Sequence, residues 1–508
     1  MPVRELPLAR FLLAVSAFLV ASSCARRAAK AEGLYQWFSL PIEVSGLPPK
    51  ADSVPVSCPI DLSAILARLR AAGAIDERSL RLLRVLADGR EQEEPVQFTP
   101  DPQPGSKRRL LAGTTPQVSY SAEYLAGETP EVKLAGRLAW IGQSDSHGHE
   151  RYRLEFGVLR GGRMIQVPFA PQNLRAFDGQ GRASPIRWFP RMQIRPQWPL
   201  EGAVHVTDQG ALVTSYHLGP GAEQAGTPGP IQRPFLYPVN GLDGVGLTEF
   251  GKPHDPTGSH AHHYSLWIAH ANVAGHDFWS ERGGIIAHRQ FDLLEDGPIF
   301  CRLIQTARWI FQGVAILCER RTLTVYAAAR DCRLMDFDLE FSPAGSQTVE
   351  LGKTTFGFLA VRVAQSMTPF DGGGEIVNAN GDRNEQAAHL KRAKWLDQSG
   401  PIAAGPPIAS IVQGALAQSP PTQWGGIAIF DHPNNVNFPT GWHCRNDGWA
   451  CAAFNIAGPY AIPPGGTLRL RYRLHLHAHN ALDAGVTRRY EQYASQPIVQ
   501  LGEAAKRP

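Results

Sequence analysis

Short apolar segments bounded by Gly, Pro and Asp recur along most of this chain, and within many of them apolar and polar residues alternate. Clear examples are RTLTVYAAA (321–329), LMDFDLEFSP (334–343), TFGFLAVRVA (355–364) and GGIAIFDHP (425–433). Side chains of a β-strand alternate between its two faces, so this pattern predicts half-buried antiparallel strands joined by turns. Amphipathic helices between the strands are missing, which argues against a parallel α/β sheet. The chain is therefore expected to be all-β.

The segments form two groups, because 508 residues exceed the size of one ordinary core. We expect a small N-terminal β-rich domain over 34–199, with a strand at 34–44 and a helical stretch at 61–74. A large antiparallel β-sandwich, of supersandwich type, is expected over 200–495, followed by a C-terminal tail over 496–508. A total of 50 Gly and 41 Pro agrees with a chain of many turns.

The segment 467–479, TLRLRYRLHLHAH, has the most regular alternation. Leu470, Tyr472, Leu474 and Leu476 are expected to face the core. The other face would carry six basic or imidazole groups: Arg469, Arg471, Arg473, His475, His477 and His479. This face is either the solvated outside of a sandwich or the floor of a groove for an acidic polymer.

The N-terminus departs from the β pattern. Arg4 and Arg10 precede the apolar run FLLAVSAFLVA, which is too short for a comfortable membrane span. Residues 1–31 therefore predict a signal for export, with cleavage after Ala31 or lipidation at Cys24 as alternatives. The mature protein would be periplasmic, an outer-membrane lipoprotein or secreted. Six further cysteines could form disulfides there, but their spacing does not give the pairing.

Histidines are concentrated between 254 and 288, where seven of the 17 occur. His262, His263 and Tyr264 are candidate acid or base residues, since imidazole titrates nearest to neutral pH. If 259–270 is an extended strand, His260 and His262 share a face and could chelate a divalent metal with a third ligand. No other cofactor is expected. Trp267 and Trp279, in the same stretch, are candidate platforms for sugar rings.

Two later stretches also combine imidazole, charge and aromatic residues. FDHPNNVNFPTGWHCRNDG (430–448) places Asp431 beside His432, where a carboxylate can orient an imidazole or raise its basicity, and adds Trp442, His443 and Arg445. His432 and His443 are candidate catalytic residues, and Asp431 and Trp442 are candidates for binding the substrate. NANGDRNEQAAHLKRAKWLDQSG (378–400) offers cations beside an aromatic platform, in Lys391, Arg392 and Trp395. Such loops on a rigid scaffold often carry function. A net charge of +4 without a basic run indicates no nucleic-acid partner.

The chain contains no GxSxG, HExxH, GxGxxG or P-loop motif, which argues against a serine hydrolase, a zincin or a nucleotide-dependent enzyme.

At these three stretches the sequence resembles the DUF6807 family, often labelled methane oxygenases. The resemblance covers about 205–480. It is carried by SHAHHYSLW (259–267), GHDFW (275–279), KRAKWLDQSG (391–400) and FDHPNNVNFPTGWH (430–443). Ser259, Ala261 and Tyr264 depart from the family's usual Asp, Pro and Arg. The resemblance implies an exported β-sandwich protein associated with polysaccharide use. No long apolar span follows the signal, so a membrane oxygenase is not expected, nor is a transmembrane partner. The N-terminal region is also similar to the β-domains that precede some polysaccharide lyase domains.

These features predict an exported enzyme that cleaves a polysaccharide or oligosaccharide, with its site on the large sandwich. In a lyase, His or Tyr removes the proton next to a uronate carboxylate, and Lys391, Arg392 or Arg473 neutralises that carboxylate. His477 would add to the substrate surface. In a hydrolase, two carboxylates flank the bond, and Asp277, Glu319 and Asp431 are the candidates. A third alternative is a glycan-binding surface protein with Trp267, Trp279, Trp395 and Trp442 as platforms.

Overall fold

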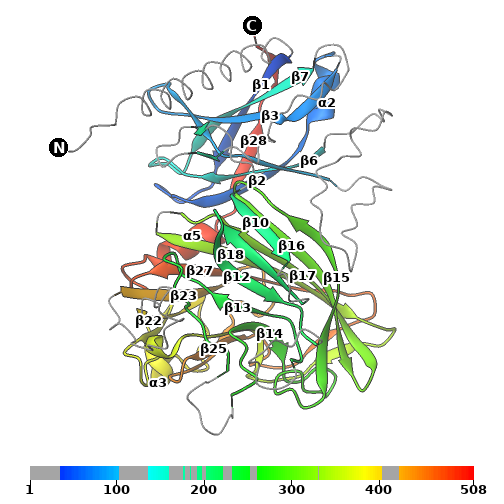
Figure 1. The fold of residues 1–508 in the computed structure, drawn as a ribbon, viewed down its shortest axis with the longest axis vertical. Helices are drawn as coiled ribbons and strands as arrows, with labels where there is room; N and C mark the ends of the chain where they lie inside the picture. Colours follow the sequence, from blue (N-terminus) through cyan, green and yellow to red (C-terminus); the bar gives the residue numbers. More distant parts are fainter. Residues whose placement is uncertain are drawn as a thin grey trace, which may run out of the picture.

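A computed structural model gives the fold, and it describes residues 35–71, 73–101, 135–159, 176–177, 183–184, 191–196, 202–220, 231–251, 260–329, 331–402 and 423–507. The expected signal and Cys24 lie outside these residues. The fold is all-β with antiparallel sheets, as predicted. Two sandwiches lie end to end, the smaller from the N-terminal part and the larger from the rest (Figure 1).

The small sandwich packs two sheets around one core, which includes Phe38, Leu82, Trp140 and Leu154. One sheet contains β28 (Ile498–Leu501), β1 (Tyr35–Ser45), β7 (Glu150–Leu159), β3 (Ala74–Val85) and β4 (Glu91–Glu94), with β29 (Ala505–Lys506) beside β1. The other contains β2 (Val54–Asp61), β6 (Ala135–Gly142) and β5 (Gln97–Pro100).

The predicted helix in this domain is shorter than expected. α2 (Leu62–Arg68) begins where the Asp61 side chain accepts a hydrogen bond from the Ala64 N–H, at 2.9 Å. This is a typical N-cap. Arg70 and Gly73 have positive φ angles of 50° and 133°, so the chain leaves the helix and enters β3.

The large sandwich packs two eight-stranded sheets face to face. The first, which we call the site sheet, contains β10 (Met192–Pro196), β11 (Ala203–Asp208), β12 (Ala211–His217), β13 (Phe235–Val239), β14 (Leu266–His270), β20 (Gly357–Arg362), β25 (Trp449–Ala453) and β24 (Gly441–Arg445). The second, the back sheet, contains β15 (Gly284–Glu295), β16 (Phe300–Phe311), β17 (Val314–Tyr326), β18 (Cys332–Pro343), β27 (Leu468–Ala478), β23 (Gln423–Asp431), β22 (Trp395–Ile402) and β21 (Glu375–Asn378). β10 joins this sandwich although 192–196 falls in the range expected for the N-terminal domain.

Three small elements lie in the connections between strands. The strands β19 (Val349–Leu351) and β26 (Tyr460–Ile462) pair with each other, and α3 (Asn384–Ala388) lies between β21 and β22 of the back sheet. The two-residue strands β8 (Ala176–Phe177) and β9 (Ala183–Ser184) form a separate pair.

Period-two alternation divides the site sheet into an inner and an outer face. Leu266 and Ile268 of β14 join the main core, whereas Trp267 and Ala269 join a second cluster on the outer face. The same alternation holds in β25, where Ala450 faces inward. The outer cluster also contains Trp279, Trp449 and Cys451. This second layer of aromatic packing forms the floor of the candidate site.

The alternation predicted for 469–479 is confirmed by β27. Leu470, Tyr472, Leu474 and Leu476 belong to the main core. The polar face is neither a solvated surface nor a groove over its C-terminal half, because Arg473, His475 and His477 are 8%, 1% and 3% exposed. Helix α5 (Val486–Ala494) covers this face, with Tyr490 and Tyr493 against Phe430 of the neighbouring strand.

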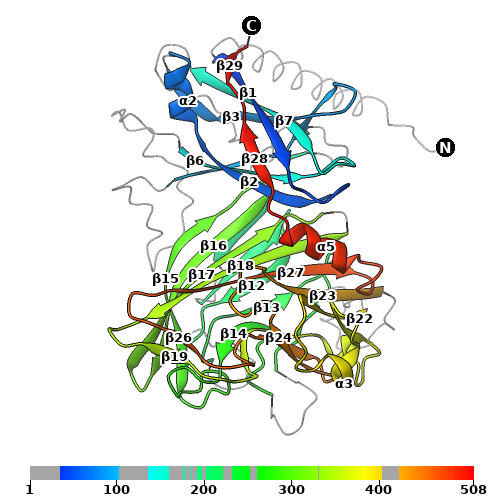
Figure 2. The same cartoon turned by 180° about the vertical axis from the view of Figure 1, so that it is seen from behind.

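The segment expected to be a C-terminal tail instead belongs to the small sandwich. β28 and β29 pair with β1, so the chain returns to the first domain after α5 (Figure 2). Helix α5 therefore lies at the junction of the two sandwiches. The alternation of the short segment 498–501 gives no sign of its distant partner, because that pairing depends on the fold of the whole chain.

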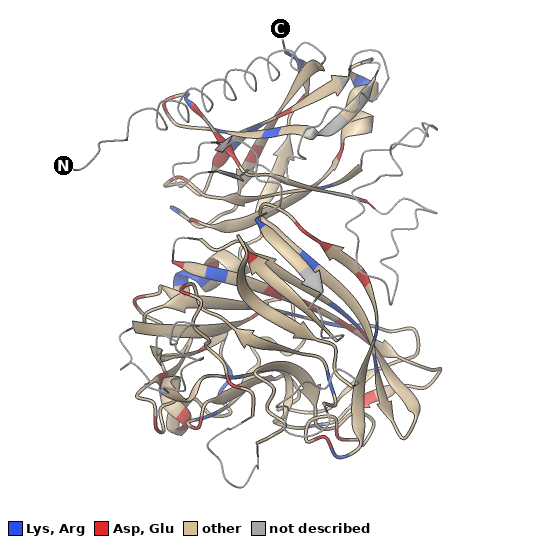
Figure 3. Cartoon of the chain, viewed as in Figure 1, with Lys and Arg blue, Asp and Glu red and all other residues tan. Residues whose placement is uncertain are grey.

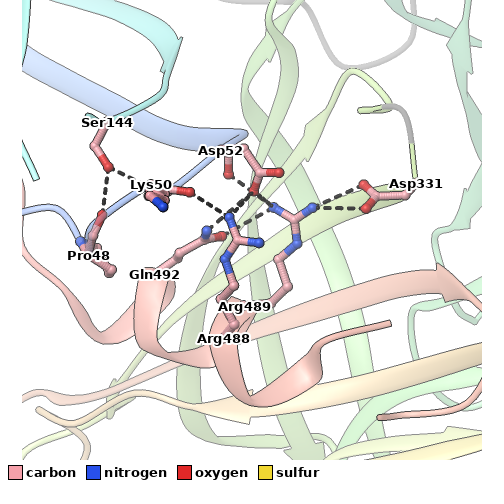
Figure 4. A network of polar contacts seen from close by, with 9 residues as sticks. Pro48, Lys50, Asp52, Ser144, Asp331, Arg488, Arg489 and Gln492 are labelled. Carbon is pink, nitrogen blue, oxygen red and sulfur yellow. Dashed lines mark hydrogen bonds and ion pairs between the residues drawn. The ribbon is translucent and has the colours of Figure 1, made fainter. Parts of the chain in front are cut away.

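The junction is held by Arg489, whose side chain is 8% exposed (Figure 4). Its guanidinium bonds Asp331 of the large sandwich at 3.0 Å and Asp52 of the small one at 2.7 Å. A second contact is Gln97, which donates to Glu295 at 3.0 Å and accepts from the N–H groups of Ile299 and Phe300. Arg489 thus links both sandwiches through α5, and Gln97 links the small sandwich to the β15–β16 hairpin of the large one. The two domains are therefore packed against each other.

Charged residues of both signs are interspersed over the two sandwiches (Figure 3). Within the described residues, no helix is long and apolar enough to cross a membrane. The six cysteines other than Cys24 are free thiols.

Candidate functional site

A hollow of about 530 Å³ lies on the outer face of the site sheet. Its lining includes Trp449 of β25 and Glu385 of α3. These two elements lie in the part of the large sandwich away from the small one (Figure 1). Five sequence segments line the hollow with imidazole, carboxylate, guanidinium, amide and aromatic groups. The lining residues are His260, Phe356, Phe370, Glu385, His443, Arg445, Asn446, Asp447 and Trp449.

The hairpin of β24 and β25 supplies most of this lining. Trp442 and Cys444 point into the main core, so the alternating His443 and Arg445 point outward. Arg445 pairs with Trp449 in the register of the two strands. Gly448 takes a φ of +101° in the connecting turn, where a β-carbon would lie 2.6 Å from the Thr368 methyl group. A glycine is thus required for the hairpin to close against its neighbour.

Glu385 of α3 fixes the turn of this hairpin. Its carboxylate accepts from the Asn446 N–H at 2.9 Å, and its own N–H donates to the Asn446 side chain at 2.9 Å. Its other oxygen lies 3.1 Å from Arg445 Nε. Only Nε of this guanidinium is bonded among the described residues, so its Nη atoms can still bind an anion.

His443 is held in one tautomer. Its Nδ1 lies 3.1 Å from the Thr355 carbonyl oxygen, which can only accept, so Nδ1 carries the proton. Nε2 is left with its lone pair, and no hydrogen bond from the described residues occupies it. Burial lowers the pKa of His443 to about 4, so the ring is neutral at ordinary pH. A neutral imidazole with a free Nε2 can accept a proton or bind a metal.

His389, next to His443, also bonds a backbone carbonyl oxygen through Nδ1. Its Nδ1 lies 2.9 Å from the Cys444 carbonyl oxygen, and the two imidazole rings are 4.7 Å apart.

Arg362 links His263, from the histidine-rich stretch, to Asp447 at the hollow. Its side chain donates to His263 Nδ1 at 3.1 Å and to the Asp447 carbonyl at 3.0 Å. Because a guanidinium only donates, His263 must accept at Nδ1 and carry its proton on Nε2. Burial holds the pKa of His263 well below its usual value. His263 thus lies in the floor, stacked on Trp267 at 5.2 Å.

Residues 260–263 form a turn, so the extended strand on which the His260–His262 metal pair depends does not form there. The His263 N–H donates to the His260 carbonyl, and β14 begins only at Leu266. Buried Arg233 holds the turn through the His262 carbonyl at 2.9 Å. The rings of His260 and His262 are 6.4 Å apart. Their predicted metal site gains no third ligand, because no group of three or more His, Cys, Asp or Glu in the described residues could hold a metal ion. His254 and Ser259 lie outside those residues.

Tyr264 is packed beside this turn instead of lining the hollow. It is 1% exposed and stacks on Phe250 at 4.8 Å. Burial raises its pKa further above neutral. His262, half-buried, has a pKa lowered to about 4 by burial. Neither residue lines the hollow that contains His443.

The four tryptophans expected as open sugar platforms are buried, and this prediction is corrected. Apolar packing on both faces of the site sheet and under α5 covers them. Trp267, Trp279, Trp395 and Trp442 are 1%, 3%, 6% and 0% exposed.

Asp431 and His432 do not form the catalytic pair that their adjacency suggested. Asp431 accepts from Asn435 and from the Thr440 N–H, both at 2.7 Å, and so shapes the loop before β24. Burial raises the pKa of Asp431 to about 7. His432 contacts the Tyr493 ring of α5, at 5.3 Å. Both lie apart from the hollow.

The predicted carboxylate-neutralising cations have other contacts. Arg473 binds Asp336 through two bonds of 2.6 and 2.7 Å, and His477 lies 2.7 Å from Asp397. Arg392 donates to backbone carbonyls such as that of Pro439, and Lys391 is exposed but does not line the hollow.

The predicted hydrolase carboxylates are also structural. Asp277 accepts from the Trp279 N–H at 2.7 Å, and Glu319 pairs with buried Arg321 at 2.6 Å.

All three stretches contribute to the hollow, through His260, Glu385 and His443. Sequence reasoning missed Glu385, Asp447 and Trp449. The GW that follows the CRND run was the available signal, since a turn glycine before an aromatic residue predicts a hairpin. Phe356 and Phe370 lie in other segments and gave no signal.

These features define an all-β protein with a polar and aromatic hollow on one face of a large sandwich. The chain belongs to the family described as "Family of unknown function (DUF6807)", whose model matches residues 203–491. No curated protein matches the chain.

Solved structures give distant alignments. A glycosyl hydrolase family 38 protein and an alpha-mannosidase, both from Enterococcus faecalis, align over 91% of this chain. Both are 8% identical, with TM-scores of 0.36 and 0.35, and 47% and 46% of their own lengths are covered. A heparinase III aligns over 65% of this chain and 43% of its own, at 10% identity and a TM-score of 0.26. The chain spans about half the length of these proteins. Scores this low carry no conclusion about its activity.

Proposed function

We propose that this protein is an exported carbohydrate-active enzyme that cleaves a uronate-containing polysaccharide or oligosaccharide at this hollow, by elimination. The observation that supports the proposal best is His443. Its Nδ1–H is committed to the Thr355 carbonyl at 3.1 Å, while its Nε2 keeps a lone pair for a proton. Fixing the tautomer in this way is what a general base requires.

In this reaction, His443 Nε2 takes the proton from the sugar carbon next to the carboxylate. The electron pair forms a carbon–carbon double bond as the glycosidic C–O bond breaks. The Nη atoms of Arg445, oriented by Glu385, would neutralise the substrate carboxylate. His260 lines the same hollow and is the candidate acid for the leaving oxygen. A bound carboxylate also raises the pKa of His443 toward neutrality, which strengthens the base.

A second candidate is hydrolysis, and one observation favours it. Glu385 and Asp447 both line the hollow, and a glycosidase needs two carboxylates at the scissile bond. Both carboxylates are already paired with guanidinium groups, since Arg445 lies 3.1 Å from Glu385 and Arg362 lies 3.7 Å from Asp447. His443 has no such partner at Nε2 among the described residues, so elimination is the leading candidate.

A product screen tests the proposal. The purified protein is incubated with polygalacturonate, alginate, xylan and galactomannan, and unsaturated uronate absorbance and reducing ends are followed together. Elimination raises both signals on a uronate polymer. Reducing ends without absorbance would assign hydrolysis. If neither signal appears on any polymer, the proposed activity is wrong.

Export is a separate part of the proposal, and it is supported by the basic and apolar pattern of 1–31. The mass of the mature protein distinguishes cleavage after Ala31 from a lipid on Cys24. A full-length mass in cells that export other signal-bearing proteins would contradict export.

A further inference from the structure

Two phenylalanines at the hollow are exposed to solvent. Phe370 is 75% exposed and Phe356 is 37% exposed, and both line the hollow with Glu385 and Asp447. Large apolar side chains are normally buried, so an exposed pair over polar groups indicates a binding surface.

Phe370 is exposed on a tightly bonded turn. The Gly372 and Gly374 N–H groups both donate to the Thr368 carbonyl, at 3.0 and 3.1 Å. The Thr368 hydroxyl donates to the Gln365 carbonyl at 3.0 Å. The Phe370 N–H donates to the Asn446 carbonyl at 3.1 Å, which ties this turn to the β24–β25 hairpin. These bonds fix the backbone that carries Phe370 beside the hollow.

Phe356 is held from the other side by aromatic contacts. Its ring is nearly parallel to that of Trp449, at 6.0 Å and 14°. It also lies 4.8 Å from the His443 ring. The exposed part of Phe356 is therefore next to the proposed base.

We propose that Phe356 and Phe370 form a subsite that binds a pyranose ring by stacking on its C–H face. The combination of groups selects this ligand class. A pyranose presents apolar C–H groups on its faces and hydroxyls around its edge, which match aromatic rings and the side chains of Glu385, Asn446 and Asp447. A purely apolar ligand would remove water from the Glu385 and Asp447 carboxylates without offering them a hydrogen bond. The subsite rests on the proposed function for its ligand class, a glycan, but not for the reaction.

Affinity electrophoresis in gels containing polygalacturonate, alginate, xylan or galactomannan tests the subsite without requiring cleavage. We expect at least one polymer to retard the native protein, and Phe370→Ala to weaken that retardation about tenfold, which corresponds to ~1.4 kcal/mol. Phe370→Trp should restore binding and Phe370→Leu should not, because a flat ring is needed and not only apolar volume. Phe356→Ala should weaken binding similarly.

The control is Leu482→Ala, which removes an 83% exposed apolar side chain from the segment before α5 and should leave retardation unchanged. No retardation by any polymer, or equal retardation of the native protein and Phe370→Ala, would overturn the subsite. Retardation that needs Phe370, without any cleavage, would support the subsite and contradict the proposed reaction. Cleavage that both phenylalanine variants retain at native affinity would do the reverse.

Discussion

Two buried histidines of this protein differ in how many of their ring nitrogens are hydrogen-bonded. His443 keeps a free Nε2 in the hollow, whereas His270 uses both ring nitrogens. The Asn272 N–H donates to His270 Nδ1 at 3.0 Å, so Nε2 carries the proton and bonds Asn455 at 3.0 Å. His270 is fully buried. The first histidine is available for chemistry, and the second is structural.

The structural role of His270 predicts acid sensitivity. Burial lowers its pKa to about 4 in the folded protein, while an unfolded histidine titrates near 6.5. Between these values only the unfolded chain binds the proton, so the free energy of unfolding falls as the pH drops from about 6.5 to 4. His270→Gln should reduce this slope by up to ~1.4 kcal/mol per pH unit. Urea unfolding at several pH values measures it, and an unchanged slope would contradict the assignment.

Glu385 distinguishes the two candidate reactions. As the group that orients Arg445, it can be replaced by Gln with a loss of about tenfold in kcat/KM, because the amide oxygen can still accept one of the two hydrogen bonds that the carboxylate accepts. As a glycosidase carboxylate, its replacement would cost about a thousandfold or more. Steady-state kinetics of Glu385→Gln on the cleaved polymer decide between them, and a loss of the larger size would contradict elimination.

At the scale of elements, the strand at 469–479 shows what alternation can and cannot predict. Leu470 and Leu474 face the core as expected, because this depends on local periodicity alone. The cover over His475 could not be predicted, since α5 reaches that face only through the tertiary fold. The turn at 260–263 was missed for a similar reason, because Arg233, far along the chain, holds it. Composition does not reveal a second aromatic layer, so it cannot distinguish buried tryptophans from open platforms.

Two neighbouring arginines of α5, Arg488 and Arg489, allow a matched test of whether this helix joins the two sandwiches. Arg489→Met removes a guanidinium that is 8% exposed and binds Asp52 and Asp331, and should lower the free energy of unfolding by about 2 kcal/mol. The neighbouring Arg488 is 53% exposed, so Arg488→Met should cost less than about 0.5 kcal/mol. Chemical denaturation measures both. Equal effects would contradict the role assigned to Arg489.

At the scale of the whole molecule, the two sandwiches are joined through the last residues of the chain. The all-β class and the large antiparallel sandwich followed from periodicity, which is local. The return of β28 and β29 to β1 did not, because strand partners distant in sequence are chosen by register and available edges. The candidate site was predictable only as segments, since His260, Glu385 and His443 meet through the topology of the site sheet and α3.

Truncation tests whether the pairing of β28 and β29 with β1 stabilises the small sandwich. A chain ending after Ser495 lacks β28 and β29 and leaves one edge of β1 unpaired. We expect the small sandwich to unfold about 5 °C or more below the intact protein, seen as an earlier calorimetric transition. A chain ending after Leu501 keeps β28 and should show a smaller shift. Identical transitions in all three chains would show that the C-terminal strands do not stabilise the domain.

The central claim is that His443 removes a proton from a uronate glycan in the hollow. The most direct measurement is the rate of unsaturated product formed by His443→Gln, beside the native protein and the control His147→Gln, which changes an exposed histidine of the small sandwich. We predict a loss of about a hundredfold or more for His443→Gln and none for the control. Native rates of unsaturated product from folded His443→Gln would contradict the claim.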